Sequence, residues 1–395
     1  MFNQGLENEM EQLLRDTILE VDLDSIAYNM RNIREMVGDK VAVAAVVKAN
    51  GYGHGSVGIA ETLLTEGADY LAVATLNEGL ELRNKFPDAK ILVMGHTPDR
   101  LLEEVVTNDL TQCIFTRDQG ESLDLLGNKH GKKPHVHIKY DTGFNRLGLV
   151  HGMESIKEIE KICSLSNIYV EGIFSHLALA GPDENRVQYE RFIWAIEELK
   201  KRGIIFRYRH IEDSIAAVDF PDYRLDMIRP GAIVYGIKGF RNGELRLRQA
   251  IRFKSRLSNV KSVKKGEGVS YDFLWKAPRD SIIGTIPFGY GDGYPRNLYN
   301  KGYVVINGEK APIVGVICMD QCMVDVTHIK NVEPGSECII YSDGRDGAMT
   351  IEEAALLSGT NKNDIMSRIS MRVPRVYLKD HRVDSIIDYT WEMRK

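Results

Sequence analysis

The sequence predicts an α/β protein with two domains, an N-terminal (β/α)8 barrel of the TIM type followed by a smaller, mostly β domain. Its 395 residues are more than one ordinary hydrophobic core accommodates. Apolar runs alternate with helical periodicity up to about residue 240, and short β-like runs replace this alternation after about residue 248. We therefore expect an N-terminal extension at residues 1–14, a barrel domain at residues 15–248 and a β domain at residues 249–395.

The barrel is indicated by eight apolar runs. They lie at residues 41–49, 69–75, 90–95, 112–116, 135–141, 168–176, 206–214 and 227–236. Most are separated by amphipathic segments such as "ESIKEIEKICSL" (154–165), in which Ile156, Ile159 and Ile162 share one helical face. Continuous apolar strands that alternate with such helices are typical of a parallel sheet covered on both faces. Eight units are the number that closes a (β/α)8 barrel.

The C-terminal part is indicated as β by short runs with turn signals. Examples are "SIIGTIPFGYGDGYP" (281–295) and "YVVINGEKAPIVGVICMD" (303–320), and Asn307-Gly308 in the second is a hairpin signal. Helical periodicity returns only at "TIEEAALLSG" (350–359). We expect a second domain built mainly of strands.

Composition disfavours several classes of function. The net charge is −5 with both signs interspersed, which gives no general attraction to nucleic acid or to an anionic membrane. No apolar run approaches the roughly 20 residues of a transmembrane helix, and the acidic N-terminus lacks the apolar core of a signal peptide. Five cysteines without C-x-x-C spacing fit a reducing compartment better than a disulfide framework or a zinc site. We expect a cytoplasmic protein.

Polar and charged side chains lie at or near the ends of five of the eight runs. They are Lys48, Lys139 with Asp141, His176, Ser214 and Arg229. The carboxyl ends of the strands of a (β/α)8 barrel meet at one rim, where the chemistry of such enzymes takes place. A single polar strand end is commonly only solvated, but five at one rim indicate a site.

The stretch "VKANGYGHG" (47–55) places a lysine between a buried strand and a glycine-rich turn. Desolvation at the mouth of an apolar barrel lowers the pKa of a lysine, so that Lys48 can form a Schiff base with a carbonyl or with pyridoxal phosphate. The following glycines can bring backbone N–H groups close to a phosphate, and Tyr52 can add a hydroxyl. By itself this pattern is weak evidence.

Two other patterns are open to competing interpretations. His135 and His137 lie on one strand face, as in some metal-dependent barrels, but the lysine pattern explains the site without a metal, and we expect none. The segment "GYGDGYPR" (289–296) superficially resembles a phosphate-binding loop. It lacks a following helix and a GK[ST] ending, so a nucleotide role is rejected.

Taken together, the motifs resemble those of the alanine racemase family, two-domain pyridoxal-phosphate enzymes of fold type III. The matching segments include "VVKANGYGHG" (46–55), "HIKYDTGFNRLGL" (137–149), "IRPGAIVYG" (228–236), "GVSYD" (268–272) and "RVPR" (372–375), in the family's order. They extend over roughly residues 15–385. The resemblance implies an N-terminal barrel and a C-terminal β domain, in agreement with the strand count.

The resemblance also implies a racemisation with two bases, one on each face of the substrate Cα. Lys48 matches the lysine that holds pyridoxal 5'-phosphate and serves one face, and Tyr271 matches the base for the other. In the family this tyrosine comes from the partner subunit, so a homodimer is implied. His176 and Arg229 match a network that favours the phenolate of the tyrosine, and Arg229 also faces the pyridine nitrogen.

Further binding roles are implied residue by residue. The cofactor phosphate matches Tyr52, Ser214 and the backbone at Gly231 and Ala232. The substrate carboxylate matches Arg146 and the backbone N–H of Met319. Lys139 matches a lysine that is often carbamylated and positions the arginine, while Tyr290, Tyr294 and Arg296 match residues along the substrate access route.

The sequence departs from the family at positions that concern the substrate. Asn363 stands where a tyrosine commonly contacts the phosphate and the substrate side chain, and "FSHL" (174–177) is similar to serine-racemising relatives. The segment "HIEDS" (210–214) adds the carboxylates of Glu212 and Asp213, which would favour a basic substrate, although carboxylates at strand ends are more often only solvated. We expect a racemase of small amino acids with alanine as the default substrate, serine as a co-substrate and lysine or ornithine as a further option.

Two functions of other classes remain alternatives. A non-catalytic pyridoxal-phosphate-binding barrel would lack both the C-terminal domain and a counterpart of Tyr271. A fold type III decarboxylase of basic amino acids would need a catalytic cysteine in a different C-terminal site, whereas Cys318 lies in the racemase-like context "VICMDQ" (316–321).

Overall fold

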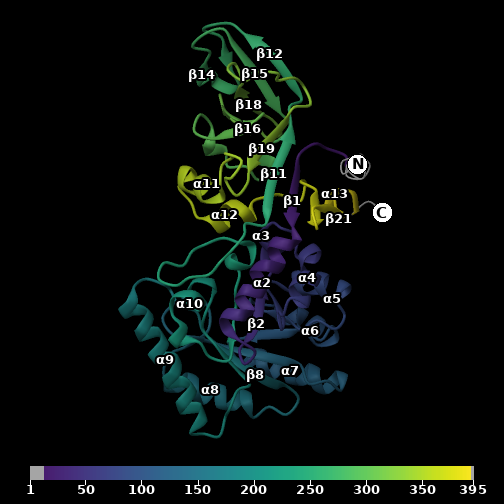
Figure 1. The fold of residues 1–395 in the computed structure, drawn as a ribbon. Helices are drawn as coiled ribbons and strands as arrows, with labels where there is room; N and C mark the ends of the chain where they lie inside the picture. Colours follow the sequence, from purple (N-terminus) through teal and green to yellow (C-terminus); the bar gives the residue numbers. More distant parts are fainter. Residues whose placement is uncertain (1–12, 393–395) are drawn as a thin grey trace.

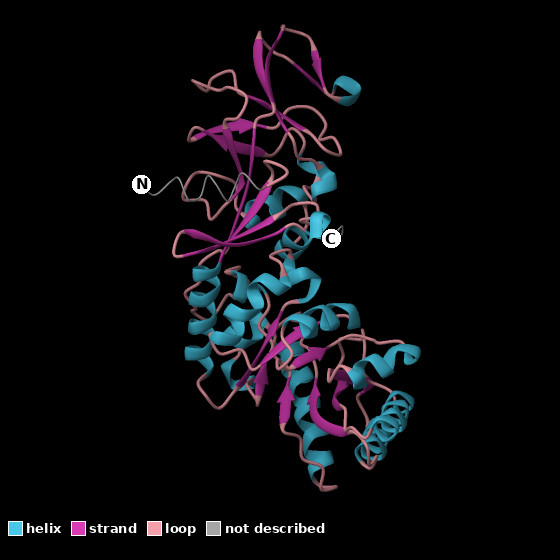
Figure 2. Cartoon of the chain, turned by 90° about the vertical axis from the view of Figure 1, so that its right-hand side faces the viewer, coloured by secondary structure: helices cyan, strands magenta, loops and turns pink. Residues whose placement is uncertain are grey.

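The structure, a computed structural model, describes residues 13–392 and consists of a barrel domain and a β domain stacked end to end (Figure 1). Residues 1–12, which make up most of the extension expected at residues 1–14, lie outside the described residues. Seen from the side, helices surround the strands of the lower domain, and strands and loops dominate the upper one (Figure 2). None of the helices formed by residues 13–392 is long and apolar enough to cross a membrane.

The barrel strands occupy all eight predicted runs. In spatial order they are β10 (Met227–Ile228), β2 (Ala42–Val46), β3 (Tyr70–Val73), β4 (Ile91–Val93), β5 (Thr111–Ile114), β6 (His135–Asp141), β8 (Tyr169–Phe174) and β9 (Tyr208–His210). Neighbours in this order pair in parallel, and β7 (Leu149–Val150) adds to β6. The ring closes between β9 and β10, where Asp226 N donates to Arg209 O at 3.1 Å. The predicted parallel barrel is confirmed.

Helices and short helical turns follow the strands, and the longer helices cover the outside of the barrel (Figures 1 and 2). They are α2 (Leu23–Val37), α3 (Lys48–Tyr52), α4 (Ser56–Thr65), α5 (Leu76–Lys85), α6 (Leu102–Thr107), α7 (Arg117–His130), α8 (Met153–Cys163), α9 (Pro182–Lys200) and α10 (Ser214–Asp219). In α8 the three isoleucines expected on one face are fully buried. Local signals set the ends: Thr116 caps α7 through its hydroxyl, and Pro182 occupies the first turn of α9.

The C-terminal domain is built around a seven-stranded sheet. Its order is β17 (Glu309–Pro312), β16 (Tyr303–Ile306), β19 (Glu337–Tyr341), β11 (Ile251–Arg256), β1 (Ile18–Asp22), β20 (Arg375–Lys379) and β21 (Arg382–Ile387). Asn307 and Gly308 connect β16 and β17 with φ of 51° and 79°, as the hairpin signal predicts.

Smaller sheets and short helices complete the C-terminal domain. One sheet contains β12 (Asn259–Val263), β15 (Ser281–Ile286) and β18 (Cys322–Asp325), and another contains β13 (Gly268–Val269) and β14 (Trp275–Lys276). The helices are α11 (Ile351–Ser358), α12 (Lys362–Ser367) and α13 (Tyr389–Glu392). Helix α11 coincides with the helical periodicity at residues 350–359, and the mostly β character of the domain is confirmed.

The first strand pairs within the C-terminal sheet. β1 lies in the part of the chain expected as the barrel domain, residues 15–248, but it pairs antiparallel with β11 and parallel with β20. Leu19 and Val21 are fully buried there. Local alternation of apolar residues indicates that a strand forms but carries no information about a partner more than two hundred residues away.

The glycine-rich turn after β2 packs against the C-terminal domain. Arg375, which is fully buried, donates through Nε and Nη2 to Gly53 O at 3.0 and 2.9 Å. A Cβ on Gly53 would overlap Met366 O, and one on Gly55 would overlap the Tyr377 hydroxyl. The sequence interpretation, in which these glycines approach a phosphate, is therefore incomplete: Gly53 and Gly55 are required by the docking of the two domains.

Candidate active site

A cavity of about 460 Å³ opens at the carboxyl ends of the barrel strands. It gathers ten of the residues that the sequence placed in the site: Lys48, Tyr52, Lys139, Arg146, His176, Ser214, Arg229, Gly231, Ala232 and Asn363. The remaining lining residues include the apolar side chains of Val46, Met94 and Phe174 and one carboxylate, that of Asp213. The cavity is therefore strongly cationic, with four lysine and arginine side chains around one acid.

Lys48 reaches the cavity on a left-handed turn. Ala49, Asn50 and Gly51 have φ of 52°, 52° and 59°, and Tyr52 continues with φ of 51°. Such a conformation costs about 1–2 kcal/mol for each residue with a side chain. Strain of this kind persists only where the surroundings hold it.

Contacts from several elements hold this turn. Glu78 Oε1 on α5 accepts from Ala49 N at 2.6 Å. Asn50 Oδ1 accepts from Ser56 N at 3.0 Å and from the Tyr389 hydroxyl at 2.9 Å. The lysine is thus presented by a backbone conformation that both domains maintain.

The Lys48 amine has a lowered pKa. Burial is the main cause, and the positive charges of Arg146 and Arg229 lower the pKa further, against the opposing effect of Glu78 and Asp213. A lowered pKa increases the fraction of neutral amine, which is the form that attacks carbonyls and accepts protons.

Three groups form a small anion cradle on one side of the cavity. Gly231 N donates to Ser214 Oγ at 2.7 Å. The Tyr52 hydroxyl is also close to Gly231, because a Cβ added to Gly231 would lie 2.6 Å from the Tyr52 hydroxyl oxygen. Burial, with a further effect of Asp213, raises the pKa of Tyr52 to about 12, so its hydroxyl remains a donor. Two hydroxyls and a backbone N–H converge here, and no carboxylate of residues 13–392 is in hydrogen-bond contact with them, which suits a phosphate.

Asp213 has a structural task beside this cradle. Its Oδ1 accepts from Ile215 N and Ala216 N, both at 3.0 Å, and thereby caps α10. Glu212, the other carboxylate that the sequence raised as a determinant of basic substrates, does not line the cavity. It is fully buried beside Arg224, with 4.0 Å between Glu212 Oε2 and Arg224 Nε.

Arg229 heads a buried hydrogen-bond chain that runs down the inside of the barrel. Its Nη1 lies 2.7 Å from His210 Nδ1, and His210 Nε2 lies 2.8 Å from His137 Nδ1. Since arginine only donates, His210 accepts through Nδ1 and in its neutral form donates from Nε2 to His137. The pKa of His210 is well below the usual value because of burial and of Arg229, which agrees with this neutral tautomer.

The chain ends at Glu171. His137 Nε2 lies 3.6 Å from Glu171 Oε2, beyond hydrogen-bond distance, whereas the Tyr70 hydroxyl donates to Glu171 Oε2 at 2.8 Å and His135 Nδ1 lies 3.2 Å from it. Burial opposes ionisation of Glu171, but the neighbouring His135, His137 and Tyr70 outweigh it and lower the pKa of the carboxyl. The two histidines of the "HVH" segment are thus both engaged by Glu171. Sequence reasoning missed His210, His137 and Glu171 as a chain, because nothing local indicates that three strands align them.

Neutral and cationic groups alternate around the mouth of the cavity. Burial, followed by Arg229 and Arg146, lowers the pKa of His176 to about 2, so the imidazole is neutral. Burial and then Arg229 lower the pKa of Lys139 to about 8. The Arg146 guanidinium lies over the Phe144 ring, 4.4 Å from its centroid, and no carboxylate among the described residues pairs with it, so that its donors are available to an anion.

The other predicted site residues lie away from this cavity. Tyr271, Met319 and Tyr290 are in the C-terminal domain, with 65%, 52% and 40% of their surface exposed. Tyr271 precedes β14, which lies at the end of the molecule remote from the barrel (Figure 1). Tyr294, expected on the access route, is instead buried against Phe288 and Tyr341, because it fills the core of the C-terminal domain. Arg296 is exposed.

Fold and site together define a class of protein, one with a (β/α)8 barrel and a β domain, in which a lysine amine of lowered pKa lies at the end of a barrel strand in a cavity. Two family models match the chain, "Alanine racemase, N-terminal domain" over residues 21–239 and "Alanine racemase, C-terminal domain" over residues 250–377. The chain belongs to the alanine racemase family, a family of isomerases.

Relatives and solved structures agree over nearly the whole length. The chain is 40% identical over 383 residues to the alanine racemase of Clostridium tetani (strain Massachusetts / E88), covering 95% of this chain and 99% of the relative. The structure of alanine racemase from Clostridium difficile 630 has a TM-score of 0.92 and 33% identity, covering 96% of this chain and 100% of that one. The alanine racemase of Bartonella henselae, with covalently bound pyridoxal phosphate, has a TM-score of 0.82 and 27% identity, covering 92% and 99%.

Proposed function

We propose that the protein interconverts L- and D-alanine with pyridoxal 5'-phosphate, in a site completed by a second copy of the chain. The observation that carries this proposal is the position of Lys48, whose amine has a lowered pKa and shares one cavity with the anion cradle and with Arg146. The Bartonella henselae relative, which carries the same cofactor covalently, supports the assignment.

The residues of the cavity fit this cofactor. Lys48 would hold its carbonyl carbon, and Tyr52, Ser214 and the backbone at Gly231 and Ala232 would hold its phosphate. When bound, the cofactor delocalises the electron pair that remains when the Cα proton of an amino acid leaves. Burial, the main cause, lowers the pKa of Arg229 to about 10, so that this side chain stays protonated at neutral pH and offers the pyridine nitrogen only donors.

The substrate carboxylate would bind Arg146. Its guanidinium offers two parallel donors, which match a carboxylate and fix the substrate in one orientation. Lys139, with a pKa of about 8, is available as a neutral amine for carbamylation, and the resulting negative charge would orient Arg146. Neutral His176 belongs to the same wall of the cavity.

Two bases on opposite faces of Cα account for racemisation most directly. In its neutral form Lys48 would accept the proton on one face, and the Tyr271 phenol of the second copy would donate on the other; the roles would be reversed in the opposite direction. Three predicted site residues are exposed and do not line the cavity of their own chain: Tyr271, Met319 and Tyr290. Their exposure supports a contribution to the cavity of a second copy. The chain would therefore act as a homodimer.

Serine is the alternative substrate, because Asn363 lines the cavity and offers an amide to a hydroxyl. Lysine or ornithine is a weaker option, since within residues 13–392 Asp213 is the only carboxylate on the cavity wall and it already caps α10. All five cysteines are free thiols, in keeping with a cytoplasmic enzyme.

The proposal is tested by incubating the purified, cofactor-loaded protein with a panel of L-amino acids and resolving D-products by chiral chromatography. We expect D-alanine as the main product. Lys48→Ala is expected to lower turnover by at least about 10³-fold, whereas Lys85→Ala, at an exposed position on α5, leaves it unchanged. Absence of D-alanine from the loaded wild-type protein would overturn the proposal.

A further inference from the structure

Two neighbouring loops of the C-terminal domain carry the exposed side chains of Tyr290 and Met319. The loops are locked by backbone hydrogen bonds, from Tyr290 N to Cys318 O at 3.1 Å and from Gly291 N to Met319 O at 2.9 Å. A Cβ on Gly289 would overlap Cys318 O, which shows how closely the backbones approach. The backbones that carry the two side chains are therefore joined directly to each other.

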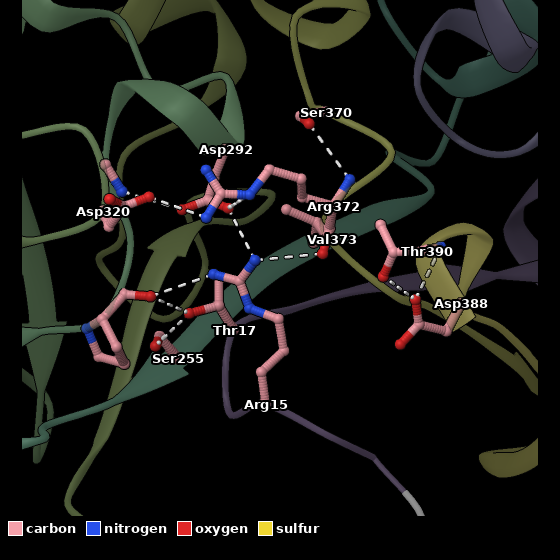
Figure 3. A network of polar contacts seen from close by, with 12 residues as sticks. Arg15, Thr17, Ser255, Asp292, Asp320, Ser370, Arg372, Val373, Asp388 and Thr390 are labelled. Atoms are coloured by element: carbon pink, nitrogen blue, oxygen red, sulfur yellow. Dashed lines mark hydrogen bonds and ion pairs between the residues drawn. The ribbon is translucent and has the colours of Figure 1, made fainter. Parts of the chain in front are cut away.

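A buried carboxylate anchors the first loop. Asp292 is fully buried, and its Oδ2 accepts from Gly289 N at 3.0 Å while its Oδ1 accepts from Arg15 Nη1 at 2.7 Å (Figure 3). The same guanidinium donates to Pro287 O and to Arg372 O, both at 3.1 Å. One side chain from the N-terminal segment thus ties together both ends of the first loop and the "RVPR" motif.

The second loop is anchored through Arg372. Its Nη2 donates to Asp320 Oδ1 at 2.8 Å, next to Met319, and its Nε lies 3.8 Å from Asp292 Oδ1 (Figure 3). Charge alternates along the series Arg15, Asp292, Arg372 and Asp320. A series of this kind with a fully buried member is stable only when every partner is present, because an unpaired buried carboxylate is costly.

The N-terminal segment is itself held in place. The Thr17 hydroxyl, which is fully buried, lies 2.8 Å from Ser255 Oγ and donates to Pro287 O at 2.9 Å. Immediately after it, β1 is inserted between β11 and β20. The position of Arg15 beside Asp292 is therefore set by the contacts of Thr17 and of β1.

We infer that Arg15 and Asp292 are positioning residues for the active site of the other subunit. This inference rests on the proposed function, in which Met319 and Tyr290 of one chain reach the cavity of the second copy. Neither loop lines the cavity of its own chain, so an effect of Arg15 on turnover through these loops would be exerted in the partner.

Mixed dimers test this assignment. Arg15→Ala and Lys48→Ala chains with different affinity tags are co-expressed, and the heterodimer is purified. In one of its two sites, the Arg15→Ala chain supplies the intact Lys48 and the Lys48→Ala chain supplies the intact loops. The other site has neither Lys48 nor intact loops. We expect the Arg15→Ala homodimer to lose roughly 10- to 100-fold in kcat, because a misplacement of about 1 Å costs this much. The heterodimer should recover about half of the wild-type activity per dimer, through its single intact site.

Control dimers separate this inference from the proposed function. A Tyr271→Phe/Lys48→Ala heterodimer should recover activity in the same way if the site is shared. If the Tyr271→Phe/Lys48→Ala heterodimer recovers activity but the Arg15→Ala/Lys48→Ala heterodimer does not, the inference about Arg15 is overturned and the shared site stands. Recovery in neither pair would overturn the shared site and, with it, the inference. Full activity in the Arg15→Ala homodimer would overturn the inference directly.

Conservative variants exclude a general loss of folding. Arg15→Lys keeps the charge opposite Asp292 but lacks the fork that also reaches Pro287 and Arg372, so we expect partial activity with bound cofactor at the wild-type level. Asp292→Asn should match Arg15→Ala in the same mixed-dimer assay. Arg31→Ala removes an exposed ion pair of the same 2.7 Å length, with Glu66, and should leave kcat unchanged. A loss of cofactor binding in Arg15→Lys equal to its loss of kcat would overturn the positioning role.

Discussion

We expect Glu212 to make the free energy of unfolding of this protein fall as the pH rises through neutrality. The side chain is fully buried, and among the described residues neither carboxylate oxygen has a hydrogen-bond partner. Burial raises its pKa from 4.5 to about 8, and Asp213 adds to this effect against the opposing charges of Arg224 and Arg229. The folded protein therefore retains a proton that the unfolded chain releases.

The sign and size follow from proton linkage. Between the ordinary pKa of 4.5 and the folded value of about 8, the folded state binds more protons than the unfolded state, so its stability decreases with rising pH. At about 1.4 kcal/mol per pH unit the loss reaches at most roughly 5 kcal/mol above pH 8. Glu212→Gln keeps the shape of the protonated side chain and removes this loss.

Urea unfolding at pH 5.5, 6.5, 7.5 and 8.5, at one protein concentration, measures the effect. The stability of Glu212→Gln relative to wild type should improve by about 1.4 kcal/mol for each pH unit and level off above pH 8. Glu61→Gln, at an exposed position on α4, serves as the control and should show no such trend. A difference between Glu212→Gln and wild type that stays constant across this range would refute the reasoning.

Three further substitutions have definite expected outcomes. The Arg375 guanidinium makes five hydrogen bonds to carbonyl oxygens, and Arg375→Lys replaces it with a group of three donors. This substitution should lower the free energy of unfolding, measured in urea, by about 2–4 kcal/mol. A decrease of less than about 0.5 kcal/mol would contradict this expectation. Gly53→Ala should lower the thermal unfolding temperature by more than Gly308→Ala does. Both glycines have positive φ, but only a Cβ at position 53 would overlap Met366 O. Equal decreases in unfolding temperature would argue against a role of Gly53 in the docking of the two domains. Asn363→Tyr should reduce kcat/KM for serine relative to alanine by about tenfold, and an unchanged ratio would count against its place beside the substrate.

The barrel was predictable because its signal is local. Each barrel strand is a short apolar run, and the helices between them repeat apolar residues with helical spacing, so all eight strands were found where expected. Strand partnership across domains was not predictable in this way. The insertion of β1 between β11 and β20 depends on packing between segments more than two hundred residues apart, and no local pattern records it.

The candidate site shows the same division. Lys48, Ser214 and Arg229 lie at strand ends, so the barrel geometry alone brought them together. Adjacent Glu212 and Asp213 look alike in sequence, yet one is buried behind the barrel wall and the other faces the cavity. Which of two neighbouring strand-end residues turns inward depends on the path of the following loop.

The left-handed turn at residues 49–52 has a consequence for how the enzyme comes into being. The turn is encoded near the start of the barrel, but partners of residues 50–54 come from the far end of the chain. Tyr389 donates to Asn50, and Arg375 and Tyr377 donate to the carbonyl groups of Gly53 and His54. A nascent chain that has completed only the barrel lacks these contacts. The segment that presents Lys48 therefore gains its full set of described contacts only when the last strands and helix of the C-terminal domain have been synthesised.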